Sequence, residues 1–306
     1  MISALTLEQL RVVVTVVDEG SFSAAARALG RVQSAISQSV STIEEIQGVT
    51  IFDRSAYRPT LTETGRVLVD QARHVLASAA RFERIAQGAS EGLEAELRLT
   101  IDPLVPSEPL LRALQDLRDH YPDLPISFST EALGGPLRRV RDGTAALGVC
   151  TLLPTVPDDV QVYALMRTHM LPVVARSHPL ASLARPATAM DLADHVQLVL
   201  SDPDNPSGPN FGLASPRVWR FADLNRRLDF LAAGFGWCRM PEHIVAAYLA
   251  DGTLVRIEVE EDTAPKEGLP IYATHLRQHT CGPATRLLLD RLQFHAEYRA
   301  VTLAAN

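Results

Sequence analysis

Cysteine and long apolar runs are both scarce in this sequence of 306 residues. Its three cysteines form no CxxC pair and no metal-ligand spacing, which favours a reducing compartment over a disulfide-stabilised secreted fold. No segment approaches the roughly 20 consecutive apolar residues that span a bilayer. The amino terminus lacks the basic and then apolar pattern of a secretion signal. We therefore expect a cytoplasmic protein with no membrane partner.

Motifs of catalysis and of cofactor binding are also missing. The sequence contains no HExxH metal motif, no GxSxG turn around a nucleophilic serine and no GxGxxG after the first predicted strand. The acidic runs at 158–159 and 258–262 lack metal-ligand spacing and are typical of solvated loops. We therefore expect no enzyme activity, no cofactor and no metal site.

The composition is that of a globular protein with more than one domain. Apolar residues make up 46% of the chain and charged residues 21%, which excludes a disordered chain. The length exceeds what one hydrophobic core usually serves. The net charge of −7 lies entirely outside the first 90 residues, where nine arginines balance nine acidic side chains. A first part with no net charge permits nucleic-acid binding if its arginine side chains cluster.

The first part of the chain has the apolar periodicity of helices interrupted by glycines. Helices are predicted over about 7–17, 24–29 and 33–46, and they are followed by Gly20, Gly30 and Gly48. Ser21 or Ser23 is the expected N-cap of the second helix. The third helix turns these apolar residues inward: Ala35, Ile36, Val40 and Ile43. The last two helices, joined by a tight turn, predict a helix-turn-helix, whose second helix can enter the major groove.

The outward face of the third helix carries almost no charge. Its residues are Gln33, Ser34, Ser37, Gln38 and Ser41. Glutamine can contact an adenine edge with two hydrogen bonds, and a serine hydroxyl can bond to a donor or to an acceptor on a base edge. These side chains therefore favour base reading, and a plain solvent-facing helix is the alternative.

A β-hairpin is predicted directly after this helix. Residues 49–52 and 60–61 read as two short strands, and the loop between them holds Arg54 and Arg58. Two guanidinium groups at a hairpin tip are suited to bind DNA phosphates. Thr62 is then the expected N-cap of a long helix that runs to about Ala89.

Several of these segments together resemble the winged helix-turn-helix of the LysR-type transcriptional regulators. The matching residues are 21–26, 33–37, 43–44, 48, 52–54 and 61–65. Members often carry arginine after the serine that corresponds to Ser37, whereas this chain has Gln38. The resemblance implies a regulator that binds double-stranded promoter DNA and responds to a small-molecule effector. The predicted DNA-binding residues are Ser23, Gln33, Ser34, Ser37, Gln38, Arg54, Arg58 and Thr60.

The long helix resembles the linker helix with which members pair two chains. Its apolar stripe consists of Val67, Leu68, Ala72, Val75, Leu76, Ala79, Phe82 and Ile85. Such a stripe favours a homodimer because one long helix has nowhere else to bury it, and packing on the same chain is the alternative. The resemblance further implies a homotetramer, built as a dimer of dimers.

The remainder of the chain alternates between strand and helix patterns. Strands are predicted over 96–101, 126–130, 145–150, 170–175, 196–200 and 271–275, and helices over 109–120, 136–142, 189–193, 220–233, 242–250 and 284–297. This rhythm predicts mostly parallel, doubly wound sheets. The chain is expected to leave a first subdomain near 157–165 and to return near Leu269.

This double crossover resembles the periplasmic-binding-protein-like effector domain of the same family. The predicted fold is therefore an α plus α/β multidomain protein with a winged helix-turn-helix over 1–65, a linker helix and hinge over 66–92, and an effector-binding domain over 93–306. The last divides into two α/β subdomains, which cover 93–164 with 269–306, and 165–268.

In parallel α/β sheets, ligands bind beyond the carboxyl ends of the strands. The predicted effector-binding residues are Thr100, Asp102, Pro103, Glu131, Gly134, Thr151, Ser201 and Phe235. If Asp102 and Glu131 face one cleft, they repel each other unless a cation lies between them. We expect either a cationic effector or an arginine there. Alternatively, Asp102 caps the following helix and Glu131 pairs with Arg138 or Arg139.

Two further functions stay open at this point. One branch of the resembled family senses peroxide with cysteines, and Cys281, beside Gly282 and Pro283, is the thiol most expected to be exposed. Buried thiols are the alternative. A solute-binding protein or an enzyme would also use an α/β cleft, but the first would need export and the second a catalytic motif.

Overall fold

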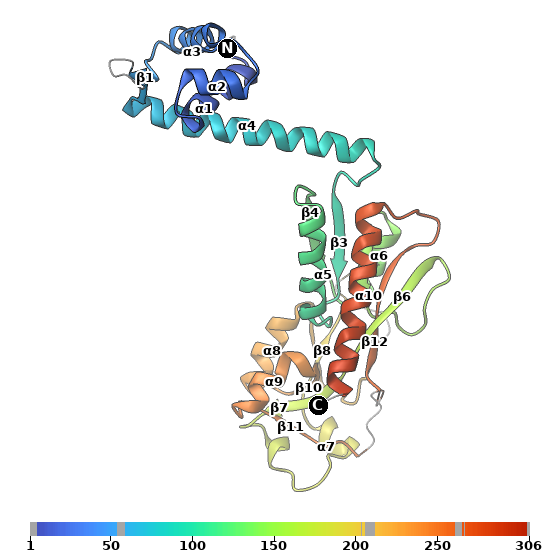
Figure 1. Ribbon diagram of the computed structural model, residues 1–306. Helices are drawn as coiled ribbons and strands as arrows, with labels where there is room; N and C mark the ends of the chain where they lie inside the picture. The colour runs from blue at the N-terminus through green and yellow to red at the C-terminus, as the bar shows by residue number, and fades with distance from the viewer. Residues whose placement is uncertain are drawn as a thin grey trace. The chain divides into compact units, whose positions relative to one another are not determined.

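The computed structural model describes residues 5–53, 59–202, 204–205, 212–260, 265 and 267–304, the last eight of them by their backbone only. The chain forms two compact units, Met1–Glu91 and Gly92–Asn306. The first is blue to cyan in Figure 1, and the second continues to red. Within the described ranges, no helix combines the length and the apolar character that crossing a membrane requires.

The described part of the first unit consists of four helices and one short hairpin. These are α1 (Leu7–Asp18), α2 (Phe22–Ala28), α3 (Gln33–Gln47), β1 (Phe52–Asp53), β2 (Thr60–Leu61) and α4 (Glu63–Ser90). The two strands are antiparallel, with Phe52 opposite Leu61. The predicted helix-turn-helix, hairpin and long helix are confirmed, although the first strand begins at Phe52 instead of residue 49.

Local signals in the sequence set the helix ends. Gly48 ends α3 with a left-handed φ of 66°, and the Val49 amide donates to the Glu44 carbonyl (3.0 Å). The Ser21 hydroxyl accepts a hydrogen bond from the backbone at the start of α2, and Thr62 does the same for α4. Of the two serines considered as the α2 cap, Ser21 is therefore the one used.

One apolar cluster joins the helices and the hairpin of the first unit. Its buried members are Val12, Val13, Val16, Ala25, Ala26, Ile36, Val40, Ile43, Ile51, Phe52 and Val69. On α3, Ile36, Val40 and Ile43 face this cluster as predicted, whereas Ala35 is exposed. The reason is that positions i, i+4 and i+7 share one helix face, and Ala35 lies about 100° away from them.

The described part of the second unit contains two five-stranded sheets. The first sheet and its helices comprise β3 (Leu97–Ile101), α5 (Ser107–His120), β4 (Ile126–Thr130), α6 (Gly135–Arg141), β5 (Leu147–Cys150), β6 (Val160–Thr168), β12 (Leu269–Leu276) and α10 (Pro283–Ala304). The second comprises β7 (Met170–Ala175), the 3₁₀ turn η1 (Pro179–Ser182), α7 (Ala189–Ala193), β8 (Gln197–Leu200), β9 (Val218–Phe221), α8 (Leu224–Ala232), β10 (Trp237–Pro241), α9 (Glu242–Ala250) and β11 (Leu254–Arg256).

Both sheets are mixed instead of mostly parallel. The first has the order β4-β3-β5-β12-β6, in which β3 is parallel to β4 and β5 while β12 is antiparallel to both its neighbours. The second has the order β11-β7-β10-β8-β9, in which β7 is antiparallel to both its neighbours. The expectation of mostly parallel sheets is wrong because β7 and β12 each pair antiparallel with both of their neighbours.

The chain passes from the first sheet to the second between β6 and β7, and it returns between β11 and β12. Strand β6 stays paired with β12 as far as Thr168, so the first crossing lies beyond the segment 157–165 where the sequence placed it. The return strand begins at Leu269, opposite Thr168. The two crossings are therefore adjacent in space.

The helix predicted over 220–233 is wrong at its start. Val218–Phe221 form β9, parallel to β8. Helix α8 begins at Leu224, where the Asp223 side chain accepts a hydrogen bond from the Arg226 amide (2.6 Å). A run of four residues is too short for periodicity to separate strand from helix. The predicted elements also lack β6, β10 and β11.

Apolar packing extends from one half of the second unit into the other. The main cluster of the second half contains Leu198 and Leu200 of β8. It also includes Leu104 and Ala132, which follow β3 and β4 of the first sheet. The loops beyond these strands are therefore buried against the second half.

Candidate functional site

The outward face of α3 presents polar side chains to solvent. Gln33, Ser34 and Gln38 are exposed, and Ser37 is half-buried. These four side chains form no hydrogen bond or ion pair with any residue that the structure describes. Their donors and acceptors are therefore available to a groove of DNA.

The start of α3 is also open. Its N-cap is Val32, which is 68% exposed and contributes no side-chain hydrogen bond to the helix. The amides of the first turn therefore lack a side-chain partner, an arrangement that suits a phosphate group. Ser23 on α2 is exposed as well. Helix ends of this kind position a protein on the DNA backbone without reading sequence.

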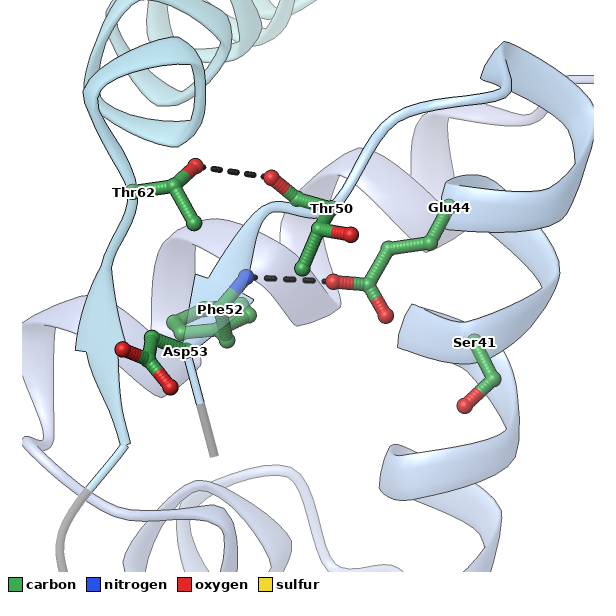
Figure 2. Close-up of a pocket in the computed structure, with 6 residues that line it drawn as sticks. All are labelled: Ser41, Glu44, Thr50, Phe52, Asp53 and Thr62. Atoms are coloured by element: carbon green, nitrogen blue, oxygen red, sulfur yellow. Dashed lines mark hydrogen bonds between the residues drawn. The ribbon is translucent and has the colours of Figure 1, made fainter. Parts of the chain in front are cut away.

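The hairpin beside α3 is described only in part. Thr60 is exposed on β2, whereas Arg54 and Arg58 lie outside the described residues, so their phosphate contacts stay predictions. Figure 2 shows a shallow pocket of about 420 Å³ between the hairpin and α3. The residues that line it are Ser41, Glu44, Thr50, Phe52, Asp53 and Thr62.

The carboxyl ends of three parallel strands in the second unit meet at Asp102. Its carboxylate is fully buried and accepts hydrogen bonds from the Leu104 amide (2.9 Å) and the Thr151 hydroxyl (3.3 Å). The amides of Leu133 and Thr151 donate to it as well. Leu133 has a left-handed φ of 56°, which is uncommon for a residue with a side chain. Asp102 thus ties together the segments that follow β3, β4 and β5.

Burial outweighs these hydrogen bonds in the acid–base behaviour of Asp102. Loss of solvent raises the pKa of its carboxyl group to about 6, although the four donors favour the charged form. The expectation that Asp102 caps the following helix is wrong, because α5 begins at Ser107 with Pro106 as its N-cap. The side chain instead closes a turn onto Leu104.

Glu131 does not face Asp102 with a free carboxylate. The Arg139 guanidinium, on the next helix, forms an ion pair and a hydrogen bond with it. The alternative in which Glu131 pairs with a nearby arginine is therefore confirmed. Thr100, at the end of β3, is fully buried, and its hydroxyl has no partner among the described residues.

An ion pair that the sequence did not reveal joins the two halves. Arg138 of α6 donates to both carboxylate oxygens of Asp202, which follows β8, and to Asp204 (3.1 Å). Asp202 is almost buried, and its hydrogen bonds from Arg138 lower the pKa of its carboxyl group. A β-carbon on Gly134 would lie 3.2 Å from an oxygen of Asp202. No local pattern links residues 64 positions apart, so only the fold shows this contact.

The remaining predicted effector residues divide by position. Pro103 directly follows Asp102, and Ser201 directly precedes Asp202, so both lie at the strand ends where the halves meet. Phe235 does not join them. It precedes β10, which is parallel to β8. Phe235 therefore lies near the amino ends of these strands, whereas Ser201 lies at the carboxyl end of β8. There it is 52% exposed and contacts the Trp219 and Phe230 rings.

All three cysteines are shielded thiols. Cys150 and Cys238 are fully buried, and Cys281 is half-buried. Burial raises the pKa of each thiol, and the negative charges of Asp102 and Glu94 add to this for Cys150 and Cys281. Each of them is therefore a protonated, weakly reactive group at neutral pH.

Comparison with known proteins places both units. Residues 7–66 match the family described as bacterial regulatory helix-turn-helix protein, lysR family, and residues 90–297 match the LysR substrate binding domain. The chain is 28% identical over 290 residues to the HTH-type transcriptional regulator AceR of Acinetobacter baumannii. The aligned residues cover 94% of this chain and 96% of that protein.

A second relative and a solved structure agree with this assignment. The probable HTH-type transcriptional regulator YhaJ of Escherichia coli is 29% identical over 269 residues, covering 85% of this chain and 88% of that protein. A structure of Corynebacterium glutamicum OxyR, a C206 mutant, has the same fold, with a TM-score of 0.54 and 24% identity over 98% of this chain and 95% of that one. The chain therefore belongs to the LysR family of DNA-binding transcriptional regulators, in which a helix-turn-helix unit is joined to a substrate-binding domain for an effector.

Proposed function

We propose that residues 1–65 read promoter DNA through α3. The observation that supports this most directly is the exposed, uncharged surface of Gln33, Ser34, Ser37 and Gln38 beside an uncapped helix start. Ser23 and Thr60 flank this surface, and Arg54 and Arg58 complete the proposed phosphate contacts. Bases are read by amide and hydroxyl groups in the major groove, while the helix start and the arginines fix the register.

Residues 66–92 pair two chains in this proposal. Beyond its contact with the first unit's core, α4 exposes a row of apolar side chains: Val67, Val75, Phe82 and Ile85. A second copy of α4 would cover this row. Two-fold pairing then requires two half-sites about 34 Å apart, one helical turn.

Further apolar surface in the second unit supports a dimer of dimers. Leu111 on α5 and Phe128 on the edge strand β4 are more than half exposed. Trp219 on the edge strand β9 and Phe235 form a second exposed apolar group. Contact between two dimers would remove these side chains from water. The proposed assembly is a homotetramer.

Residues 93–306 are proposed to bind the effector where their two halves meet. The boundary between the subdomains follows β6, which pairs with β12 as far as Thr168, and the chain returns to the first subdomain at Leu269. The proposed contacts are Thr100, Asp102, Pro103, Glu131, Gly134, Thr151 and Ser201. The unpartnered Thr100 hydroxyl supports this location because a buried polar group without a partner is costly unless something else satisfies it. Phe235 is left out because it lies at the amino end of β10, and the proposed contacts lie at the carboxyl ends of the strands.

A redox mechanism is not favoured by the thiols. A peroxide sensor needs an accessible thiolate, whereas Cys150 and Cys238 are buried and the pKa of each of the three thiols is raised. The proposal is therefore ligand control of a regulator that is not an enzyme. Because its target is chromosomal DNA, the proposed location is the cytoplasm.

Electrophoretic mobility shift with the DNA upstream of its own coding region tests the function. We expect a retarded complex at nanomolar protein that survives an excess of random duplex at moderate salt. A variant in which both Gln33 and Ser34 are alanine should bind that fragment and random DNA equally weakly. A wild-type protein without preference for any genomic fragment would contradict the proposal.

A further inference from the structure

Ile51 lies between the two helices to which the proposed function gives separate tasks. Its side chain is buried, and its backbone forms hydrogen bonds in two directions. The Ile51 amide donates to the Glu44 carboxylate of α3 (2.7 Å), and its carbonyl accepts from the Thr62 amide at the start of α4 (3.0 Å). Figure 2 shows Glu44 and Thr62 on opposite sides of this chain segment.

On the α3 side, one carboxylate oxygen holds two successive amides. Glu44 Oε1 accepts from Ile51 and also from the Phe52 amide (3.1 Å), the second of which is dashed in Figure 2. Hydrogen bonds to an ionised acceptor are stronger than those between neutral groups. The segment entering the hairpin is therefore fixed to the last turn of α3.

On the α4 side, contact is made by backbone and by a hydroxyl. The Thr62 hydroxyl donates to the Thr50 carbonyl (2.7 Å) and accepts from the Gly65 amide (2.8 Å), so the cap of α4 is also bonded to the hairpin segment. A β-carbon on Gly65 would lie 2.1 Å from the Ile51 carbonyl oxygen. The first turn of α4 therefore lies directly against Ile51, at a distance that only glycine allows.

We propose that Glu44, Ile51, Thr62 and Gly65, together the Ile51 junction, fix the direction of α4 relative to α3, so that pairing of two α4 helices sets the separation of the two α3 helices on DNA. This inference rests on the proposed function, which gives α3 the reading of DNA and α4 the pairing of chains. Glu44 is then a positioning residue, which acts on DNA recognition through the hairpin segment and not through contact with a base.

A second contact explains why the junction sets a direction. Val69 and Ala72 of α4 are buried, and Val69 belongs to the apolar cluster that contains α1. Apolar packing alone is not directional and permits small rotations. The hydrogen bonds of the junction, about two turns earlier, are directional. Two separated contacts, one of them directional, define the axis of a helix.

The test compares binding to DNA with altered half-site spacing. Wild-type protein selects a duplex from a random library, and two derivatives carry one base pair inserted or deleted at its centre. One base pair changes the half-site separation by about 3.4 Å and their relative rotation by about 35°. The measured quantity is the ratio of the Kd for the shifted duplexes to the Kd for the selected duplex, for full-length protein.

We expect wild-type protein to bind the selected duplex at least about tenfold more tightly than the shifted ones. Glu44→Ala leaves two amides without their acceptor, which corresponds to about tenfold weaker binding of the selected duplex. Its spacing ratio should fall towards one. Glu44→Gln keeps a carbonyl oxygen at the same place and should retain the preference. Glu45→Ala, on the exposed neighbour, should bind as wild-type protein does.

Thr62→Val tests the other side of the junction by removing the hydroxyl that bonds to Thr50. It should also lower the spacing ratio, and it decides the question if Glu44→Ala does not fold. Spacing ratios of Glu44→Ala or Thr62→Val that equal the wild-type value would overturn the junction, as would a Glu44→Gln protein that loses the preference. A wild-type protein that enriches no duplex would instead remove the proposed function, and the junction with it.

Discussion

Arg138 and Asp202 form a bidentate ion pair between the two halves of the second unit. Arg138 lies on α6, beside the first sheet, and Asp202 follows β8 of the second sheet. Nη2 lies 2.9 Å from Oδ1, and Nη1 donates to Oδ2. The carboxylate is 7% exposed and the arginine side chain 39% exposed. This bidentate pair connects the two halves at the strand ends where we place the effector.

Replacing Arg138 by alanine should destabilise the second unit. The variant removes both Arg138 donors from the buried Asp202 carboxylate, which keeps the Asp204 amide as a donor, and this costs about 1–3 kcal/mol in the free energy of unfolding. Both tryptophans of the chain, Trp219 and Trp237, lie in the second sheet, so urea denaturation followed by their fluorescence reports this unit.

Arg226→Ala is the matched control for this prediction. Arg226 forms an exposed pair with Asp229 three residues along α8, and such pairs contribute less than about 0.5 kcal/mol. Equal losses in the two variants would show that the pair between the sheets adds no stability.

The buried Asp102 carboxyl group predicts a pH dependence of stability. Its pKa is raised in the folded state, from an ordinary 3.8 to about 6. Folding therefore gains stability from its protonation below about pH 4, and this gain is lost as the pH rises through 6. Relative to Asp102→Asn, the free energy of unfolding of wild-type protein should fall by about 2–3 kcal/mol between pH 4 and pH 7.

Chemical denaturation of both proteins across this pH range measures the difference between their free energies of unfolding. Because the other titrating groups are the same in both proteins, their contributions cancel in this difference. A difference that stays constant, or that rises with pH, would mean that burial does not raise the pKa of Asp102.

Gln33→Ala should weaken base reading at one position. The expected loss is about 1–3 kcal/mol on the selected duplex, while binding to random DNA stays unchanged because phosphate contacts supply it. Competition with duplexes substituted at single base pairs should show that the variant no longer distinguishes one of them. Gln47→Ala, at the other end of α3, should keep the wild-type pattern, and equal losses on specific and random DNA would contradict the assigned role of Gln33.

Phe82→Asp should separate the chains that α4 pairs. Phe82 is 73% exposed within one chain, so its burial by a partner helix would make a charge there costly. Analytical ultracentrifugation should show a shift to smaller assemblies at micromolar protein. Gln87→Asp places the same charge on the opposite side of α4 and should leave assembly unchanged. A Phe82→Asp protein that sediments like wild type would reject the proposed pairing surface.

Local signals made the first unit predictable. Gly48 and Thr62 mark helix ends by chemistry that acts within a few residues, and the spacing of Ile36 and Val40 marks the buried face of α3. Strand β9 was missed because its four residues are too few for a period, and α8 follows it after a short gap.

The candidate effector site was predictable only in outline. The sequence places Thr100, Asp102 and Thr151 at strand ends, and the structure brings Asp102 and Thr151 into contact. The bond between Arg138 and Asp202 depends on how two sheets meet, which no neighbouring residue encodes. Phe235 was misplaced because its sequence surroundings do not show at which end of β10 it lies.

Leu104 and Ala132 belong by chain order to one half of the second unit and by packing to the other. If either half came apart alone, it would expose these side chains to water at about 25 cal/mol for each Å². The interior of the second sheet is therefore completed by side chains from the other half. The two halves should melt in a single cooperative transition, and excising either one should leave a fragment prone to aggregation.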